Sequence, residues 1–287
     1  MRGIDLQKWD FERKMWSYLR GEWRLGGWWY YYLYALAIKV PLGTWGLGLL
    51  ALGVGLFGRG YAASWRDELV LLAPAAVVLA LVSSQTGFSH HLRYVLPVFP
   101  FAFIATSRIA RAVELGHWKL VSIGGAALLW SVGSSLGHYP HSLSYFNELA
   151  GGPRHGHEHL VDSNIDWGQD LLYLEGWLDG HPEARPLGLG YRLPCIDPCI
   201  TGIEHTLPPR DAPAPGWYAL SVGTIRHRTR DYEYFLHFEP VAMAGYSIYI
   251  YHVTLDEANR VRRKLGLPEL QDPSASRLTR LRERARE

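Results

Sequence analysis

Long apolar stretches separated by short charged loops fill the first half of the chain, and this pattern ends near residue 138. Four stretches carry few or no charged residues, at positions 40–57, 69–88, 94–111 and 119–137. Crossing a bilayer core takes about 20 mostly apolar helical residues, so we expect each stretch to be a span. Pro97 and Pro100 in the third predict a kinked helix. The pattern predicts an α-helical multi-span membrane region with about four spans.

Shorter apolar stretches separated by turns follow over residues 138–268. Their spacing predicts strands at 159–161, 187–190, 217–222 and 246–253, with helices at 169–178 and 255–265. This part is predicted to be a small α/β domain. Residues 269–287 form a basic tail that ends in RLTRLRERARE and contains five arginines.

Residues 1–39 precede the first predicted span. The aromatic run Trp28–Tyr34 is typical of a membrane interface. Residues 1–24 are charged and lack the apolar core of a secretory signal peptide. We expect residues 1–39 to be an outer-face loop followed by an interfacial aromatic segment.

The charges of the short loops predict an orientation. Arg59 and Arg66 lie in one loop, and Arg108, Arg111 and Lys119 lie two spans away on the same side, which predicts a cytoplasmic side. The domain after residue 138 is then extracytoplasmic. Seven basic residues among the first 39 argue for the opposite orientation.

Composition and charge exclude several classes of protein. The mean hydropathy of −0.06 averages two unlike halves, and the net charge of +2 gives no basic field for nucleic acid. Only two cysteines, Cys195 and Cys199, are present, which excludes a disulfide-rich scaffold. These two residues fit either one local bridge or two inert thiols.

Several segments resemble the carboxy-terminal half of bacterial family 39 membrane glycosyltransferases, which are relatives of protein O-mannosyltransferases. The segments are GEWRLGGWWYYYLYALAIKVPLG, HLRYVLPVFPF, HYPHSLSYFNELAGGP, VDSNIDWGQDL and GYSIYIYHV. Together they extend over nearly the whole chain. The pair YFNELAGGP and DSNIDWGQDL is the most specific part of the resemblance.

The resemblance implies a GT-C architecture that transfers a sugar from a polyprenyl-phosphate carrier at the outer face of a bacterial inner membrane. Such enzymes place a carboxylate general base in the first outer loop. Because it has about four spans instead of about a dozen, the sequence is interpreted as a fragment, a truncated gene model or one half of a split enzyme. The catalytic base is then expected in a missing amino-terminal part. The expected partners are membrane lipid, the polyprenyl-phosphate-linked sugar and that missing half.

Five residues are candidates for binding the lipid phosphate, because negative charge develops on the phosphate as the glycosidic bond breaks. Arg93 could hold a phosphate through two hydrogen bonds, or it could be an ordinary interfacial arginine beside Tyr94. Lys39 is either a phosphate ligand or an anchor whose side chain extends to the interface. Arg20 and Arg24 could belong to a loop that faces the sugar donor, or to an ordinary solvent-exposed amphipathic surface.

The run DSNIDWGQDL is a candidate sugar-binding site. Asp, Asn and Gln side chains bind sugar hydroxyls, and tryptophan stacks on a pyranose face. The same residues could form a strand-to-helix junction in which Asp166 caps the next helix and Trp167 is buried. The candidates are Asp162, Asn164, Asp166, Trp167 and Gln169.

Two metal sites are conceivable in this part of the sequence, one in the DSNIDWGQDL run and one at the histidines before it. The DxNxD pattern lacks the glycine and the glutamate of a calcium-binding EF-hand loop, so that site is rejected. His155, His157 and His159 would share one face of a strand and could bind zinc, although a loop is favoured. No cofactor is indicated.

Two other functions remain as alternatives. A non-catalytic membrane-anchored module could bind a glycan or a partner through the second domain. A transporter fragment is less favoured, since the spans carry almost no ionisable residues.

Overall fold

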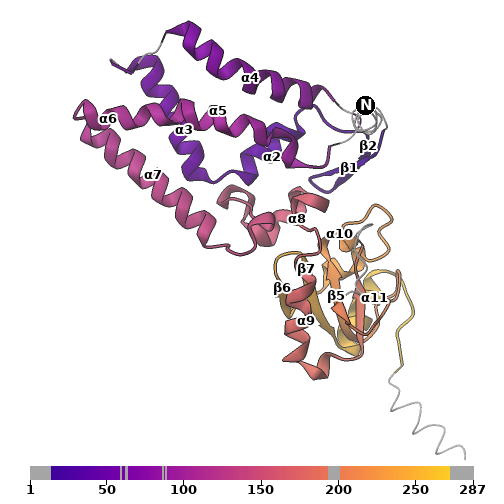
Figure 1. The fold of residues 1–287 in the computed structure, drawn as a ribbon. Coiled ribbons are helices and arrows are strands. Elements are labelled where there is room, and N and C mark those ends of the chain that lie inside the picture. Colours follow the sequence, from indigo (N-terminus) through magenta and orange to yellow (C-terminus); the bar gives the residue numbers. More distant parts are fainter. Residues whose placement is uncertain are drawn as a thin grey trace, which may run out of the picture. The chain divides into compact units, whose positions relative to one another are not determined.

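The computed structural model describes residues 14–58, 60–61, 64–85, 87, 89–192 and 201–271. The chain forms two compact units, Met1–Ile165 and Asp166–Glu287 (Figure 1). The division differs from the expected one at residue 138. Residues 138–165 belong with the helices because their buried side chains hydrogen-bond to residues before position 93.

The first unit, called the helical unit, is built around apolar helices. They are α2 (Tyr31–Lys39), α3 (Leu42–Phe57), α4 (Trp65–Ser84), α5 (Phe99–Ser107), α6 (Arg111–Glu114) and α7 (Trp118–Leu136). The 3₁₀ turns Leu92–Val98 and Arg108–Ala110 flank α5, so Leu92–Glu114 forms one apolar helix. Instead of the expected kink, the residues before α5 adopt a 3₁₀ turn that contains Pro97. Pro100 lies in the first turn of α5, where backbone N–H groups have no acceptor within the helix, so proline costs no hydrogen bond there.

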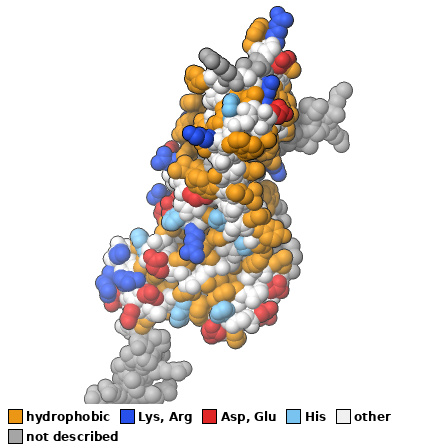
Figure 2. Space-filling model, turned by 90° about the vertical axis from the view of Figure 1, so that its left-hand side faces the viewer, with side chains coloured by type: hydrophobic (Ala, Val, Ile, Leu, Met, Phe, Trp, Pro, Cys, Tyr) orange, Lys and Arg blue, Asp and Glu red, His pale blue; other side chains and the backbone are white. Residues whose placement is uncertain are grey.

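Three helices are long and apolar enough to cross a membrane: α4, Leu92–Glu114 and α7. Counting α2 and α3 as one bent span raises the number to four. Few of the residues in these helices are buried inside the unit. Hydrophobic side chains cover much of its visible surface, in the upper part of Figure 2. The prediction of a partly membrane-embedded α-helical protein is therefore supported.

Three of the four predicted stretches correspond to helices long enough to cross a membrane, whereas the stretch at 40–57 forms α3, which is long enough only together with α2. Helix α4 begins at Trp65 rather than near residue 69, because Ser64 caps it and Asp67 and Glu68 fill its first turn. Close packing joins α3 to α7: a Cβ on Gly43 would lie 2.1 Å from the Ala127 carbonyl oxygen. Arg108 also pairs with Glu68 of α4 at 2.7 Å.

A β-hairpin stands at one end of the helical unit, where the sequence predicted only a loop. Strands β1 (Trp16–Leu19) and β2 (Glu22–Leu25) pair antiparallel. Arg20 and Gly21 both have positive φ, which suits a tight two-residue hairpin turn. Backbone bonds fix this hairpin, from Met15 N to Gly87 O and from Arg20 N to His159 O.

Short turns rather than strands fill residues 138–165. They are the 3₁₀ turns Ser142–Ser144, Glu148–Ala150, Pro153–His155 and Asp162–Asn164, and the helical turn α8 (Gly156–His159). The predicted strand at 159–161 is therefore wrong. Gly156 allows the turn to pack tightly, since a Cβ there would lie 2.2 Å from the Phe146 ring. In Figure 1 the hairpin and α8 lie at the end of this unit opposite α6.

The second unit, called the sheet unit, contains a five-stranded mixed sheet in the order β4-β3-β5-β7-β6. Its strands are β3 (Leu187–Gly190), β4 (His205–Thr206), β5 (Gly216–Ser221), β6 (Ala242–Ala244) and β7 (Ile248–Val253). Strand β3 runs parallel to β4 and β5, whereas β7 is antiparallel to β5 and β6. The predicted strands at 187–190, 217–222 and 246–253 are confirmed within two residues.

Helices complete the sheet unit. They are α9 (Leu171–Asp179), α10 (Val222–Ile225) and α11 (Leu255–Lys264), with 3₁₀ turns at Pro182–Ala184 and Glu233–His237. Helix α9 packs its leucines against one face of the sheet, and Phe235 packs on Tyr218 and Tyr251 of the other. The predicted helices at 169–178 and 255–265 are confirmed as α9 and α11.

Candidate functional site

The break between α2 and α3 is the organising feature of the helical unit. The two helices bend by 108° around Val40 and Pro41. A break in an apolar helix leaves carbonyl groups that need donors. Asn147 supplies them: its amide donates to the carbonyls of Ala37 (2.7 Å) and Val40 (2.8 Å), and its backbone N–H donates to Ile38 O (2.8 Å). Asn147 of the YFNELAGGP motif thus stabilises the bend.

Asn164 of the DSNIDWGQDL motif joins three segments beside this bend. Its Nδ2 donates to Tyr31 Oη (3.0 Å) and to the His90 carbonyl, and its Oδ1 accepts from Leu92 N (3.2 Å). Only 2% of the residue is exposed. The Asn164 side chain is therefore used internally and does not face a ligand.

The ammonium of Lys39 is also directed inward. It donates to the carbonyls of Leu143 and Asn164, both at 2.7 Å, and lies 4.3 Å from the centre of the Phe146 ring. This arrangement fits neither of the two roles weighed from the sequence. Lys39 instead fastens the end of α2 to the segment after α7.

The candidate cations Arg20, Arg24 and Arg93 are exposed at this end of the helical unit. Each guanidinium lies near an aromatic ring: Arg20 is 5.9 Å from the centre of Tyr34, Arg24 is 5.9 Å from Trp28, and Arg93 is 5.7 Å from Tyr94. Arg93 follows Leu92, which is bonded to Asn164. Arg93 and Lys39 are thus linked through Asn164, but only the Arg93 side chain faces outward.

Imidazoles lie beside Arg93. His91 Nδ1 contacts Ser163 Oγ, and its ring packs edge-on against Tyr94. Burial lowers the pKa of His91 to about 4, and the neighbouring charges of Arg93 and His90 act in the same direction. His91 is therefore neutral at pH 7, whereas the guanidinium of Arg93 stays charged.

Asp162 is the acidic residue of this group. It has a φ of 56°, a left-handed conformation that aspartate tolerates better than most residues. Burial raises the pKa of its carboxyl, and the nearby His90 partly offsets that rise. A carboxylate with a raised pKa is suited to accept a proton from a hydroxyl group. We call Arg93, His90, His91, Asp162 and Ser163 the helix-end cluster.

The boundary between the units divides the candidate sugar-binding run. Asp162 and Asn164 belong to the helical unit, whereas Asp166, Trp167 and Gln169 belong to the sheet unit. Asp166 is 4% exposed and accepts from Gly168 N (2.8 Å) and Tyr191 Oη (3.2 Å). Gln169 Oε1 accepts from Trp167 N at 2.7 Å. Trp167 itself is 42% exposed, so the burial expected of it at a simple junction is not found.

Asp166 does not cap α9, contrary to the junction interpretation. Its carboxylate closes a turn onto Gly168 N, and the residue before the helix is Asp170. Asp170 accepts instead from the backbone N–H groups of Tyr246 (3.1 Å) and Ser247 (3.0 Å). A Cβ on Gly245 would lie 2.1 Å from the Asp170 carboxyl carbon. The DSNIDWGQDL and GYSIYIYHV motifs are therefore joined by a structural clamp.

The three alternating histidines do not form one face. They lie in the 3₁₀ turn Pro153–His155 and in α8. His159 contacts Tyr34 Oη, and His155 contacts Glu158 at 3.4 Å. Within the described ranges, no group of three His, Cys, Asp or Glu side chains could hold a metal ion. Cys195 and Cys199 lie outside the described residues.

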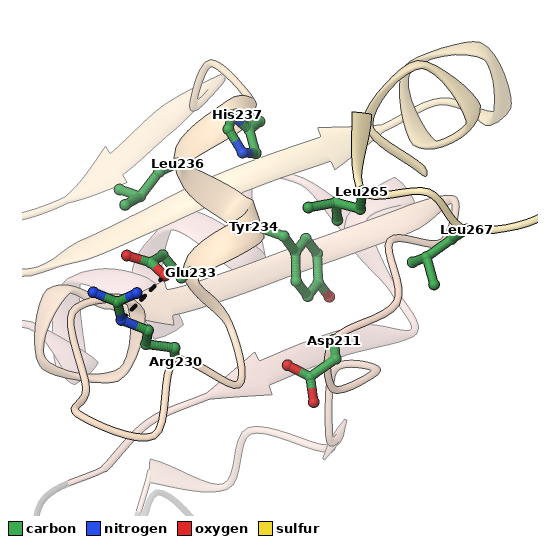
Figure 3. A pocket seen from close by; sticks show the side chains of 8 residues that line it. All are labelled: Asp211, Arg230, Glu233, Tyr234, Leu236, His237, Leu265 and Leu267. Atoms are coloured by element: carbon green, nitrogen blue, oxygen red, sulfur yellow. Dashed lines mark ion pairs between the residues drawn. The ribbon is translucent and has the colours of Figure 1, made fainter. Parts of the chain in front are cut away.

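The sheet unit carries an open pocket of about 500 Å³ (Figure 3). Leu236, Leu265 and Leu267 supply apolar walls, and Asp211 and His237 add polar groups to the lining. Arg230 pairs with Glu233 at 3.5 Å, as the dashed line in Figure 3 shows. The Tyr234 hydroxyl donates to Pro209 O (2.7 Å), so its ring is fixed as part of the wall.

Sequence reasoning missed the internal roles of Asn147, Tyr31 and Tyr191. Each partner is distant along the chain, 110 residues in the case of Asn147 and Ala37, so no local pattern indicates the contact. The position of Asn147 inside the YFNELAGGP segment, which carried part of the family resemblance, was the available signal. Comparisons with protein-family models, curated proteins and solved structures find no match for this chain.

Proposed function

We propose that this protein is glycosyltransferase-like and binds a sugar carried on polyprenyl phosphate at the outer face of a membrane. One observation supports this most directly. The exposed Arg93 acts electrostatically on His91, which lies beside His90, and His90 in turn lies near the acidic Asp162, at one end of a unit built from apolar helices. An anionic group on a long apolar tail matches that combination of surfaces.

Three members of the helix-end cluster have distinct chemical parts in this proposal. Arg93 stabilises the charge that develops on the departing lipid phosphate, because a guanidinium can donate two parallel hydrogen bonds. Neutral His91 orients Tyr94 and Ser163 by contact. Asp162 can take up a proton, whereas the resemblance places the general base of the reaction in another segment.

The test is binding of polyprenyl phosphate by the full chain in nanodiscs, comparing Arg93→Gln with the unaltered protein. Loss of a charge-assisted contact costs about 1.5–3 kcal/mol, which weakens binding by about 10- to 150-fold. Arg66→Gln is the matched control. Arg66 also lies over a neighbouring aromatic ring, 5.6 Å from the centre of Trp65, but it belongs to the first turn of α4, and α4 begins at the end of the helical unit away from the hairpin (Figure 1).

Equal loss in both variants would indicate general attraction of the lipid to positive charge and would contradict the site. Unchanged binding by Arg93→Gln would contradict it as well. Lys39→Gln separates positioning from direct contact: we expect a lower unfolding temperature, because two carbonyls lose their donor. A large loss of binding without loss of stability would instead restore Lys39 as a phosphate ligand.

The second candidate function, a membrane-anchored binding module, is favoured by one observation, the pocket of about 500 Å³ in the sheet unit. Its apolar walls and the exposed Asp211 suit a ligand that combines an apolar group with a donor or a cation. Oligosaccharide titration of the full chain, with Asp211→Asn against Asp179→Asn, tests this function. A Kd that neither variant changes would exclude the pocket.

A further inference from the structure

Helix α2 differs in direction from the helices that could cross a membrane. It bends by 108° from α3, so if α3 runs near the membrane normal, the axis of α2 lies close to the membrane plane. Helix α3 has 16 residues and is about 24 Å long, while α2 has 9 residues and is about 14 Å long. The bend therefore places α2 at the edge of the apolar layer.

The two sides of α2 have different surroundings. Tyr31, Tyr32, Ala35 and Leu36 are buried where α2 packs against α4 and the turns Leu92–Val98 and Glu148–Ala150. The other side presents a stripe at helical spacing, Tyr30, Leu33 and Ala37, all exposed. Trp29 beside it is 65% exposed and Leu33 is 44% exposed.

This outward stripe has no charged residue, because the ammonium of Lys39, the one charge on α2, is bonded to inward carbonyls. Aromatic rings with polar atoms favour the boundary between acyl chains and headgroups. We propose that α2 is an in-plane helix of the membrane interface, with Tyr30, Leu33 and Ala37 in contact with lipid at the level just below the headgroups. It neither crosses the bilayer as part of a broken span nor lies in water.

The hydrogen bonds that the carbonyl groups at the bend accept support an in-plane helix. Asn147 and the 3₁₀ turn after it cover the carbonyl end of α2, so the helix can stop at the interface without exposing unpaired carbonyls to lipid. Trp130 of α7 donates to Glu148 at 3.1 Å, which ties this turn to a candidate span. The inference does not depend on the proposed glycosyl transfer.

Depth measurement on the full chain in phospholipid nanodiscs tests the inference. After Cys195→Ser and Cys199→Ser, a fluorescent label is attached at Leu33→Cys, Leu49→Cys or Glu158→Cys. Leu49 is 66% exposed near the middle of α3, and Glu158 is exposed on α8. Lipids with a nitroxide near the headgroup or deep in the acyl chain then quench the label according to its depth.

We expect the ratio of shallow to deep quenching to exceed one at position 33 and to fall below one at position 49, with little quenching at position 158. Deep quenching at position 33 would show that α2 belongs to a crossing span and would overturn the proposal. Absence of lipid quenching at position 33, with position 49 still quenched, would show that water or protein covers the stripe and would overturn it equally. If the label at position 49 is not quenched, α3 does not lie in the bilayer, and the proposal is overturned as well.

Discussion

The helical unit and the sheet unit achieve stability by different means. In the sheet unit, leucine and isoleucine side chains such as Leu174, Leu187 and Ile250 are fully buried between α9 and the sheet. In the helical unit, large apolar side chains of the spans, such as Leu49 and Leu129, are exposed, while Asn147 and Asn164 are among the most buried residues. The apolar side chains of the first half thus leave surfaces long and apolar enough to cross a membrane, and buried amides connect its segments.

The largest effect that separates the units is expected from Gly245→Ala. A Cβ would lie 2.1 Å from the Asp170 carboxyl carbon, and φ is +57°. The carboxylate must move and release Tyr246 and Ser247, so we expect a loss of about 4 kcal/mol in the sheet unit. Hydrogen exchange resolved by peptide should show faster exchange there, with the helical unit unchanged.

Gly176→Ala is the matched control for Gly245→Ala. Gly176 lies in α9 of the same unit, and a Cβ there would meet nothing within 4 Å. Alanine in a helix interior gains about 0.5–1 kcal/mol over glycine, so exchange should slow slightly. Equal destabilisation by both variants would refute the clamp.

Asn147→Ala tests the other unit and should have the next largest effect. Truncation leaves the carbonyls of Ala37 and Val40 without their donor. Each buried group left unsatisfied costs about 1–3 kcal/mol, and we expect about 3 kcal/mol in total. Thermal unfolding in detergent should show it, with exchange in the sheet unit unaltered. Stability like that of the unaltered protein would mean that water satisfies the bend.

The units also differ in how far the sequence predicted them. Uninterrupted apolar runs predicted the spans, because lipid imposes one requirement on every residue of a span. Periodicity likewise predicted β5, β7 and α11. The strand at 159–161 failed because a short apolar stretch does not distinguish a strand from the end of a helical turn, whereas tight packing of Gly156 on Phe146 fixes a helical turn up to His159.

The candidate site was predicted less completely than the fold. Arg93 could be identified because an arginine at the start of an apolar run is conspicuous in any sequence. The inward position of Lys39 could not, since its acceptors Leu143 and Asn164 are backbone carbonyls more than 100 residues away. The hairpin β1–β2 had a signal, Arg20–Gly21 between two aromatic segments, which was not used.

A smaller effect is expected from the titration of Asp166 in the sheet unit. Burial raises the pKa of its carboxyl to about 6, with smaller opposing effects from its hydrogen bonds. The folded state then holds a proton that the unfolded state releases near pH 4. The contribution of Asp166 to stability should therefore be largest below pH 4, fall by about 3 kcal/mol between pH 4 and pH 6, and stay level above.

Asp166→Asn should remove this fall while keeping the acceptor for Gly168 and Tyr191. Unfolding of the full chain followed by hydrogen exchange from pH 4 to pH 7 provides the measurement. A fall of the same size in Asp166→Asn would assign it to another group. A stability difference between the unaltered protein and Asp166→Asn that does not change over this range would contradict the raised pKa of Asp166.

The smallest expected effect on stability concerns Trp167. Because 42% of this residue is exposed, Trp167→Ala should cost about 1 kcal/mol or less. Leu174→Ala on the neighbouring helix provides the comparison: Leu174 is 0% exposed, and its truncation should cost about 2–5 kcal/mol. Thermal unfolding of both variants measures this difference, and oligosaccharide titration separates two roles for the ring.

If Trp167 stacks on a sugar, Trp167→Ala should weaken binding while Leu174→Ala leaves the Kd unchanged at temperatures where it is folded. If Trp167→Ala destabilises the sheet unit as much as Leu174→Ala, the tryptophan is part of the core despite its exposure, and sugar stacking at this position is refuted.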